Sequence, residues 1–438
     1  MMVGSVVLFG DSLGIPQLLE VLPAELIRGL VGADIRRHDH PQLRSIAETS
    51  KVPLLIQPKR TSPRYPSFLE QILDVAPDLI LVNSYSMLLG RELLEMPKCG
   101  AVNIHGALLP QYRGSNPIQW ALLNNEIETG VTMHYMSADF DTGDIIAERR
   151  VPIHFEDTWR DIQTRILAAT QVMLAEEIPR LLSHANARQP QDQAKARYFR
   201  RRHPEDGRID WQDSILSIYN LVRALIKPHP GAFYYQGTDK VVLDEYLSIP
   251  KLTALKYSAQ GGGQILRVAD VVLTPLTLED LTALLGGING HEQGLLSSPN
   301  KKKTEVQRKQ CFESLRRLND LIIFGIRLAE TGELIGSCRL KDIDYIHYRA
   351  ELQIALNEVS FDHSYFKAAV RSLLDFAFKQ LGLYRVCSHV LSTDRAVIII
   401  YEQTGFKHEG TLKEAARIDG KQIDVIVMGI SRNEFVAE

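Results

Sequence analysis

Cysteine is scarce in this sequence, and so are the features that mark metal, disulfide and nucleic-acid proteins. The 438 residues contain four cysteines, and none of them stand at CxxC spacing: Cys99, Cys311, Cys338 and Cys387. This pattern favours neither a zinc site nor a disulfide framework, so we expect no metal. The formal net charge is only -3. No global basic field therefore draws the chain to nucleic acid, and we expect no such partner.

Long apolar stretches are missing as well. The chain begins MMVGSVVLFGDSLG, without a basic segment and without a hydrophobic run long enough for a signal peptide or a membrane span. We therefore expect a cytoplasmic protein with no membrane partner. A chain of this length exceeds one ordinary hydrophobic core, which predicts two or three domains.

Short β-rich runs alternate with amphipathic stretches over the first 135 residues. This rhythm is typical of βαβ units, so we predict an α/β domain with a parallel sheet covered on both faces. The expected strands are 5–9, 52–57, 79–83, 100–104, 129–136 and 144–153. The expected helices are 16–31, 68–76, 89–96 and 158–182.

The rest of the chain divides at polar and glycine-rich segments. Residues 184–197 are polar and weakly patterned, YSAQGGGQ at 257–264 is typical of a flexible joint, and the charged run near 300–310 predicts exposed helix surface. We therefore predict a first domain at 1–183, a linker with a small OB-like, β-rich subdomain at 184–250, a linker at 251–268, and a third unit of mixed strands and helices at 269–438.

The stretch VNIHGALLPQYRGSNP, residues 102–117, carries polar side chains at the end of an expected strand. Asn103 and His105 are two residues apart on that strand, so both side chains lie on one face. Ligands of open parallel sheets bind outside the carboxyl ends of the strands. An amide donor and a titratable imidazole thus share the expected ligand position.

Asp141 follows in SADFDTGDII, in a predicted tight turn before a strand. A carboxylate that reaches His105 would orient its ring and fix its tautomer. Asn103, His105 and Asp141 together could stabilise an oxyanion, remove a proton and steady the charged ring. No serine or cysteine nucleophile accompanies the group, which indicates that the nucleophile belongs to the substrate. Taken singly, each of these features is more often incidental.

The whole set, in order, resembles the 10-formyltetrahydrofolate-dependent formyltransferases. NIHGALLPQYRGSNPIQWALLNNEIETGVTMHYMSADFDTGDIIAE resembles their catalytic core from end to end, and the resemblance covers about residues 1–250. It implies a Rossmann-like formyltransferase domain, with 10-formyltetrahydrofolate as co-substrate and Asn103, His105 and Asp141 at the catalytic positions. RRHPEDGRIDW and KPHPGAFYY resemble the family's small C-terminal subdomain.

The resemblance also assigns binding segments. SMLLG, residues 86–90, stands where the family wraps the pterin with backbone groups. The folate-binding residues implied in this way are Met87, Leu88, Leu89, Asp139 and Asp141. HGALLPQYRG stands at the substrate-side loop, and the residues implied there are Leu109, Pro110, Tyr112 and Arg113.

The branches of this family differ in the acceptor, the molecule that receives the formyl group. A methionyl-tRNA formyltransferase needs a basic face, but the one dense basic cluster, RYFRRRHPEDGR, is diluted by Glu205 and Asp206. The better resemblance is to sugar N-formyltransferases, which implies a nucleotide-linked amino-deoxy sugar as acceptor. Our most specific expectation is a UDP-linked 4-amino-4,6-dideoxy sugar of pseudaminic-acid synthesis, used for a cell-surface glycan. A charged tRNA and a siderophore hydroxyornithine remain alternatives.

Residues 269–432 resemble the GNAT acetyltransferase fold through ELIGSCRL, LLDFAFKQLGLYRVCSHV and AVIIIYEQTGFKHEGTL. That family binds the CoA pyrophosphate on a glycine-rich turn that opens a helix, but SFDHSYFKAAVRSLLDFAF has no glycine. Asp362, Ser364 and Phe366 stand at the usual glycine positions, which predicts a degenerate domain without acetyl-CoA. Tyr401 matches the family's frequent general acid, although such an aromatic is more often a core residue. A bifunctional formyl/acetyltransferase and a homodimerisation module remain alternatives.

Overall fold

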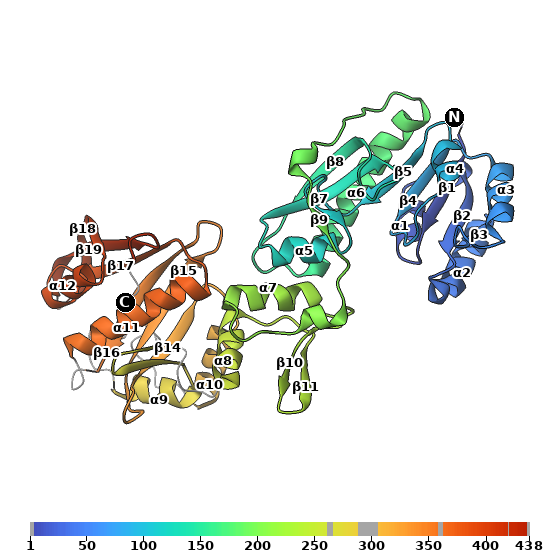
Figure 1. Ribbon diagram of the computed structural model, residues 1–438. Helices are drawn as coiled ribbons and strands as arrows, with labels where there is room; N and C mark the ends of the chain where they lie inside the picture. Colours follow the sequence, from blue (N-terminus) through green and yellow to red (C-terminus); the bar gives the residue numbers. More distant parts are fainter. Residues whose placement is uncertain (1–3, 261–265, 288–304, 358–361, 419, 436–438) are drawn as a thin grey trace. The chain divides into compact units, whose positions relative to one another are not determined.

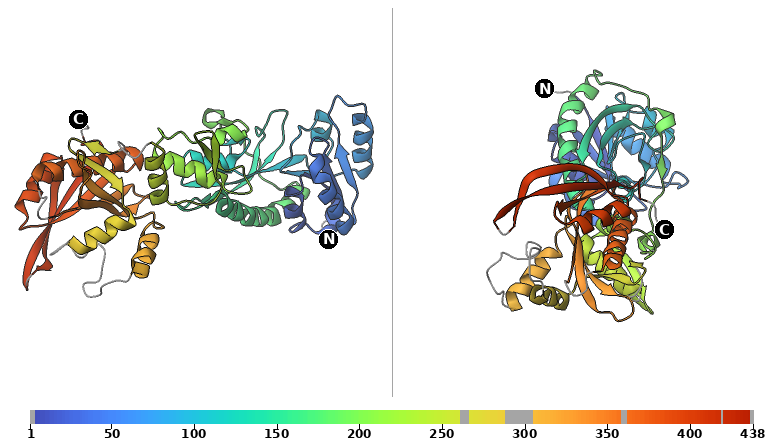
Figure 2. Two further views of the ribbon diagram at one scale, coloured as in Figure 1. Left: turned by 90° about the horizontal axis from the view of Figure 1, so that it is seen from below. Right: turned by 90° about the vertical axis from the view of Figure 1, so that its left-hand side faces the viewer.

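The chain forms two compact units, Met1–Asp206 and Gly207–Glu438. The computed structural model describes residues 4–260, 266–287, 305–357, 362–418 and 420–435 (Figures 1 and 2). Each unit combines helices with a large β-sheet, as the predicted α/β class requires. Among the described residues, no helix is both long and apolar enough to span a membrane.

The sheet of the first unit is parallel over most of its width. Its described strands follow the order β3-β2-β1-β4-β5-β7-β8. The first five are mutually parallel, whereas β7 and β8 continue the sheet antiparallel. The strands are β1 (Val6–Gly10), β2 (Ile27–Ala33), β3 (Leu54–Gln57), β4 (Leu79–Asn83), β5 (Ala101–His105), β7 (Glu128–Tyr135) and β8 (Ile145–Pro152); β6 (Arg113–Gly114) pairs separately with β9 (Tyr198–Phe199).

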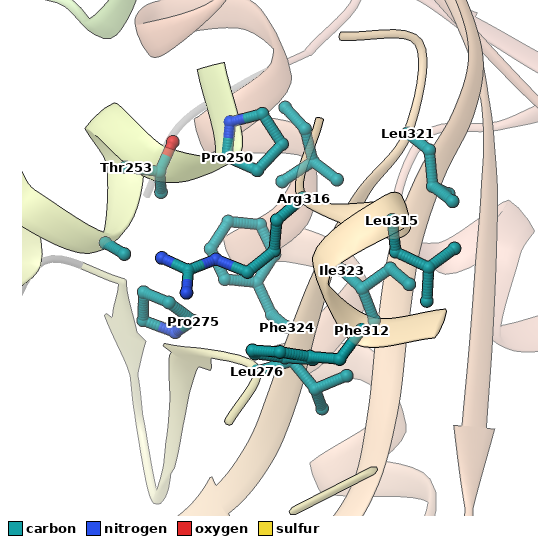
Figure 3. A pocket seen from close by; sticks show the side chains of 12 residues that line it. Pro250, Thr253, Pro275, Leu276, Phe312, Leu315, Arg316, Leu321, Ile323 and Phe324 are labelled. Atoms are coloured by element: carbon teal, nitrogen blue, oxygen red, sulfur yellow. The ribbon is translucent and has the colours of Figure 1, made fainter. Parts of the chain in front are cut away.

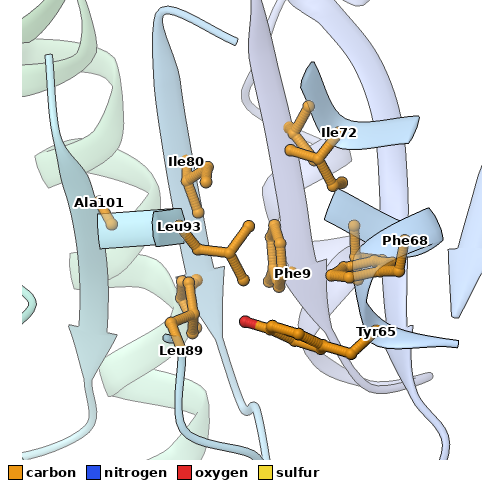
Figure 4. Packing of buried hydrophobic residues seen from close by; sticks show 11 residues of the cluster. Phe9, Tyr65, Phe68, Ile72, Ile80, Leu89, Leu93 and Ala101 are labelled. Carbon is orange, nitrogen blue, oxygen red and sulfur yellow. The ribbon is translucent and has the colours of Figure 1, made fainter. Parts of the chain in front are cut away.

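Helices α3 (Tyr65–Val75) and α4 (Arg91–Glu95) cover one face of this sheet. Their apolar side chains pack on alternate residues of the strands, so that Phe9, Ile80 and Ala101 meet Phe68, Ile72 and Leu93 in one core cluster (Figure 4). Helix α6 (Trp159–Leu182) packs on β8 and also contacts α1 (Gly14–Leu19). The remaining helices of this unit are α2 (His40–Ser50) and α5 (Pro117–Leu123). The buried strands explain the nearly unbroken apolar runs in the sequence.

The predicted helix at 16–31 is wrong. Helix α1 ends at Leu19, and β2 occupies Ile27–Ala33. An apolar run of this kind fits a buried strand as well as a helix, and packing decides between them. Gly32 lies close under α2, where an added Cβ would come within 2.7 Å of the Leu43 side chain.

The second unit is built on a larger sheet. Its described strands follow the order β12-β13-β14-β15-β16-β17-β19-β18, and β16 and β17 form a parallel pair. Its strands are β12 (Arg267–Val268), β13 (Val271–Pro275), β14 (Ile322–Leu328), β15 (Leu334–Asp344), β16 (Arg349–Leu356), β17 (Arg385–Leu391), β18 (Lys407–Ile418) and β19 (Lys421–Ser431). Its helices are α7 (Ile215–Leu225), α8 (Ile249–Ala259), α9 (Leu278–Gly287), α10 (Glu305–Leu315), α11 (His363–Asp375) and α12 (Arg395–Gln403); α11 runs on into a π-helical turn (Phe376–Gln380). The small subdomain contains the hairpin of β10 (Ala232–Gln236) and β11 (Asp239–Leu243).

The predicted linker at 251–268 is largely regular structure. Helix α8 covers the first half of it, and β12 stands at its end. Residues 261–264 of the predicted flexible joint lie outside the described residues, as do residues 300–304 of the charged run. One face of α8 is buried, and on that face Lys256 donates hydrogen bonds to the Asp213 carbonyl at 2.7 Å and to Gln380 Oε1 at 2.9 Å. Helix α8 and strand β12 thus form regular structure on either side of residues 261–265, between the small subdomain and the third predicted unit.

Candidate active site

Strand β5 brings Asn103 and His105 to one face of the sheet, as predicted from their spacing. The neighbouring strand β7 places His134 opposite Asn103 and Thr132 opposite His105. His105 is buried, whereas Asn103 is half-buried. The site therefore has one accessible amide beside an imidazole that is largely shielded from water.

The hydrogen bonds of His105 fix which ring nitrogen can take up a proton. Its Nε2 lies 2.6 Å from the backbone carbonyl of Tyr112. A carbonyl only accepts, so Nε2 carries the proton of the neutral ring. The unprotonated Nδ1 faces Asp141 Oδ2 at 3.7 Å. Burial lowers the pKa of His105 against the opposing effect of Asp141, so the ring is neutral and able to accept a proton at neutral pH.

Asp141 lies between two histidines. Its Oδ2 accepts a hydrogen bond from the backbone N–H of Gly114 at 2.9 Å, and its Oδ1 lies 3.5 Å from His134 Nε2. Burial raises the pKa of Asp141, but His105, His134 and the Gly114 N–H together lower it to about 2. The group is thus an anion held beside the atom of His105 that would become positively charged.

The sequence analysis missed His134. Its Nδ1 donates to the Tyr135 carbonyl at 2.8 Å, so Nε2 is the acceptor in the neutral ring. Asn103 Nδ2 lies 3.1 Å from that Nε2 and donates to it. His134 therefore orients the amide of Asn103 and leaves its second N–H for a ligand. A histidine on an apolar strand was the available signal, but only the strand register shows that it faces Asn103.

Buried side chains and hydrogen bonds fix the conformation of the predicted substrate loop. Thr132 Oγ1 donates to the Ala107 carbonyl at 2.7 Å and accepts from the Leu109 N–H at 3.2 Å. Leu109 and Pro110, Tyr112 and Arg113 are all buried. The Tyr112 hydroxyl donates to Glu126 at 2.7 Å. The side chains implied to contact substrate thus form the interior of the loop, and their contribution is to its shape.

The predicted folate segment is mixed in exposure. Met87 is half-buried and Leu88 is exposed, whereas Leu89 belongs to the core cluster under α3 and α4. The Leu88 carbonyl accepts from Gln57 at 3.2 Å, so this part of the backbone is fixed. Asp139 is exposed on the turn that carries Asp141.

The bases of the two loops meet on one core. Tyr85, at the start of the first loop, and Met136, at the start of the second, both pack against the same cluster. Loops 84–90 and 136–144 are therefore anchored on a common support.

The second unit contains the predicted acetyltransferase-like elements. Strands β16 and β17 pair only over residues 349–351 and 385–387. Asp362 caps α11, and its carboxylate accepts from the Ser364 N–H at 2.6 Å. The Ser364 hydroxyl lowers the pKa of this carboxylate most, and the N–H groups of Ser364 and Tyr365 lower it further. The N-terminus of α11 is thus occupied by the chain's own anion.

Tyr401 lies in the core of the second unit. It is 2% exposed, and its ring meets Phe366 and Phe406 at centroid distances of 5.9 and 4.9 Å. Its hydroxyl accepts from Ser388 at 3.2 Å. This environment fits a packing aromatic better than a general acid.

A pocket in the second unit lies between α8, α10, β13 and β14 (Figure 3). Pro250, Pro275, Leu276 and Phe312 contribute apolar walls, and the Arg316 guanidinium lies 5.3 Å from the centre of the Phe312 ring. The lining contains none of the candidate catalytic residues, which belong to the first unit. The pocket is therefore separate from the Asn-His-Asp constellation.

Comparison with known families identifies each part of the chain. The Formyl transferase model matches residues 6–178, and the model of the Formyl transferase, C-terminal domain, matches residues 202–271. The Acetyltransferase (GNAT) domain model matches residues 270–407. The chain is therefore a formyltransferase enzyme with an appended GNAT domain, as the sequence resemblance predicted.

Solved structures resemble one part of the chain or the other. An N-formyltransferase from Helicobacter canadensis, described in complex with folinic acid and dTDP-3-aminofucose, is 19% identical, with 55% of this chain and 86% of that chain covered and a TM-score of 0.43. A chimera of the spermidine N-acetyltransferase SpeG from Vibrio cholerae and hSSAT is 25% identical over 38% of this chain and 97% of that chain, with a TM-score of 0.33. A dodecameric spermidine N-acetyltransferase from Vibrio cholerae is also 25% identical, over 37% and 95%, with a TM-score of 0.34.

Proposed function

We propose that this formyltransferase moves a formyl group from 10-formyltetrahydrofolate to the amine of a nucleotide-linked amino-deoxy sugar. The observation that carries the chemistry is the pairing of His105 Nδ1 with Asp141 beside the amide of Asn103. The neutral ring accepts a proton, the anion stabilises the ring once it is charged, and the amide donates to an oxyanion.

The reaction follows from these roles. The neutral amine of the acceptor attacks the formyl carbon, and a C–N bond forms as the carbonyl oxygen becomes an oxyanion. The free N–H of Asn103 donates to this oxygen, and His105 Nδ1 removes the proton from the attacking nitrogen. The bond between the formyl carbon and the folate N10 then breaks, and the proton on His105 passes to N10. Asp141 remains an anion throughout, since its pKa is about 2.

The folate is assigned to the loops around the site. Loops 84–90 and 136–144 share one core support, and each exposes an apolar side chain, Leu88 at 43% and Phe140 at 61%. Exposed apolar side chains beside a polar reacting group suit a pterin or aminobenzoyl ring. Phe140 is an addition to the predicted folate residues Met87, Leu88, Leu89, Asp139 and Asp141.

The charge distribution favours a small acceptor over tRNA. Within the basic cluster at 197–208, Arg200 forms two bonds to Asp206, at 2.6 and 2.7 Å, and Arg202 donates to the Asp206 carbonyl at 2.7 Å. Arg113 and Tyr198 are bonded to each other as well. Arg200 and Arg202 are thus engaged within the cluster, whereas Arg197, Arg201 and Arg208 are exposed. The engaged pair and the two acidic residues weaken the match to a phosphate backbone. A UDP-linked 4-amino-4,6-dideoxy sugar of pseudaminic-acid synthesis is the specific acceptor we propose, from the sequence resemblance.

We propose that the GNAT domain does not transfer acetyl groups. A CoA pyrophosphate would have to displace the Asp362 carboxylate from the start of α11 and would be repelled by it. The bifunctional alternative predicts acetylation of the same amino sugar. It is favoured by the family match over residues 270–407 and opposed by the capped helix.

The test is a panel of nucleotide-linked amino sugars, incubated with 10-formyltetrahydrofolate and analysed by mass spectrometry. We expect formylation of a 4-amino-4,6-dideoxy sugar, and no product with charged initiator tRNA or hydroxyornithine. Formylation of the tRNA with no sugar product would refute the proposed acceptor. Parallel reactions with acetyl-CoA test the bifunctional alternative, which predicts acetylation of the same amino sugar.

A further inference from the structure

The segment predicted as a linker at 184–197 is part of the active-site structure. Gln189 forms paired backbone bonds with Ile145 at 2.8 and 2.9 Å, directly after the turn that carries Asp141. The segment continues directly into strand β9 (Tyr198–Phe199), which pairs with β6, and β6 contains Gly114. One segment therefore fixes both the strand that follows Asp141 and the backbone N–H that binds it. This segment lies between the two formyltransferase matches, which end at 178 and begin at 202.

Gln191 connects these parts through its side chain, which is 8% exposed. Its Nε2 donates to the carbonyls of Asp141 at 2.9 Å and Gly143 at 2.7 Å. Its Oε1 accepts from Nε and Nη2 of Arg113 at 3.0 and 2.6 Å. Carbonyls only accept and a guanidinium only donates, so a single orientation of the amide satisfies all four bonds.

Arg113 is itself fixed on every side. It is 1% exposed, and its Nη1 donates to Gln193 Oε1 at 3.0 Å and to the Tyr198 hydroxyl at 2.9 Å. A guanidinium held in this way cannot follow a movement of Gln191. Asp141 meanwhile has a positive φ of 54° and is the residue whose place relative to His105 matters most.

We propose that Gln191, held by Arg113, is a positioning residue that sets the Asp141 turn against His105 for formyl transfer. Gln191 has no polar atom left for the substrate, so it acts through Asp141. Its loss would let the turn relax and would weaken the stabilisation of the charged imidazole. A displacement of about 1 Å at such a site can lower turnover by about 100-fold.

The kinetic test rests on the proposed function and compares two matched changes. Gln191→Met keeps the length of the side chain and removes all four bonds. Gln193→Met removes one bond to Arg113 and the bond from Gln193 Nε2 to the Gln191 carbonyl at 3.3 Å, but none to the Asp141 turn. We expect kcat to fall about 10- to 100-fold for Gln191→Met with KM little changed, and less than about 2-fold for Gln193→Met. Gln191→Glu keeps the bonds to Arg113 and should still lose turnover, because its side chain cannot donate to the turn.

A double variant tests whether Gln191 affects turnover through Asp141. If Gln191 acts through Asp141, Gln191→Met should add little to the loss already caused by Asp141→Asn, since residues in one network are not additive. Losses that multiply, or unchanged kcat in Gln191→Met, would overturn the proposal.

Nitrogen NMR of labelled histidine supplies a readout that needs no substrate, with the His105 signal assigned by its absence in His105→Asn. The pKa of His105 should fall in Gln191→Met, because Asp141 raises it in the wild type, and should not change in Gln193→Met. An unchanged His105 titration in Gln191→Met would refute the positioning role. Absence of formyl transfer in the wild type, with the shift present, would instead refute only the proposed function.

Discussion

Replacing Asp141 by asparagine tests whether the buried anion is held as the structure shows. Asparagine resembles the protonated acid in size and carries no charge, so the variant measures the free energy that ionisation contributes. The surroundings lower the pKa of Asp141 from 3.8 to about 2. That difference corresponds to about 2 kcal/mol of stabilisation of the folded protein while His105 is charged, and to less at neutral pH, where the ring is neutral.

The sign of the pH dependence follows from the lowered pKa. The contribution is complete above the unfolded value of 3.8 and is lost as the pH falls through about 2. Asp141→Asn should therefore lower the free energy of unfolding by up to about 2 kcal/mol in the range between the pKa of Asp141 and that of His105, and by less both at pH 7 and at pH 2.

Urea unfolding can be followed in the first unit through Trp120 and Trp159, with Trp211 changed to phenylalanine in every protein compared. The matched control is Asp139→Asn, because Asp139 is exposed on the same turn and should change the free energy of unfolding by less than about 0.5 kcal/mol. A loss below about 0.5 kcal/mol for Asp141→Asn at every pH between 3 and 7, or a loss at pH 2 as large as the maximum in that range, would refute the reasoning.

Three further predictions concern the reaction and the appended domain. His105→Asn should lower kcat by about 100-fold or more with KM nearly unchanged, measured by steady-state kinetics, and near-wild-type turnover would exclude His105 as the base. Activity should rise with pH and reach its plateau below the usual histidine pKa of 6.5, because burial lowers the pKa of His105; a profile with its midpoint above 6.5, with chemistry rate-limiting, would contradict this. Calorimetry should detect no binding of acetyl-CoA, since Asp362 caps α11, and micromolar binding with acetylated sugar as product would support a bifunctional enzyme.

The spacing of apolar residues predicted a helix or strand correctly where the spacing fits only one of the two. The strands at β1, β4 and β5 and the long helix α6 follow directly from apolar runs and helical spacing. Strand β2 was missed because its apolar residues also fit a helix, and its identity depends on contacts such as Leu43 against Gly32. Helix α8 could have been predicted, since Ser248 precedes it and Pro250 stands in its first turn.

Some residues of the candidate site could also be predicted from the sequence, and others could not. The spacing of Asn103 and His105 and the turn at Asp141 are visible in the sequence, and the structure places all three together. His134 and Gln191 could not be predicted, because one depends on strand register and the other on bonds across about fifty residues of chain. Arg113 was assigned to substrate but is buried, and a sequence does not show which way a loop side chain turns.

The most direct test of the central claim is transfer of the formyl group itself. Wild-type protein and the His105→Asn variant should each be incubated with 10-formyltetrahydrofolate and a nucleotide-linked amino-deoxy sugar, with tetrahydrofolate release and the formylated sugar measured together. We predict equal amounts of both products with the wild type and a loss of about 100-fold or more with the variant. Equal rates for the two proteins, or tetrahydrofolate release without any formylated sugar across the panel, would contradict the account.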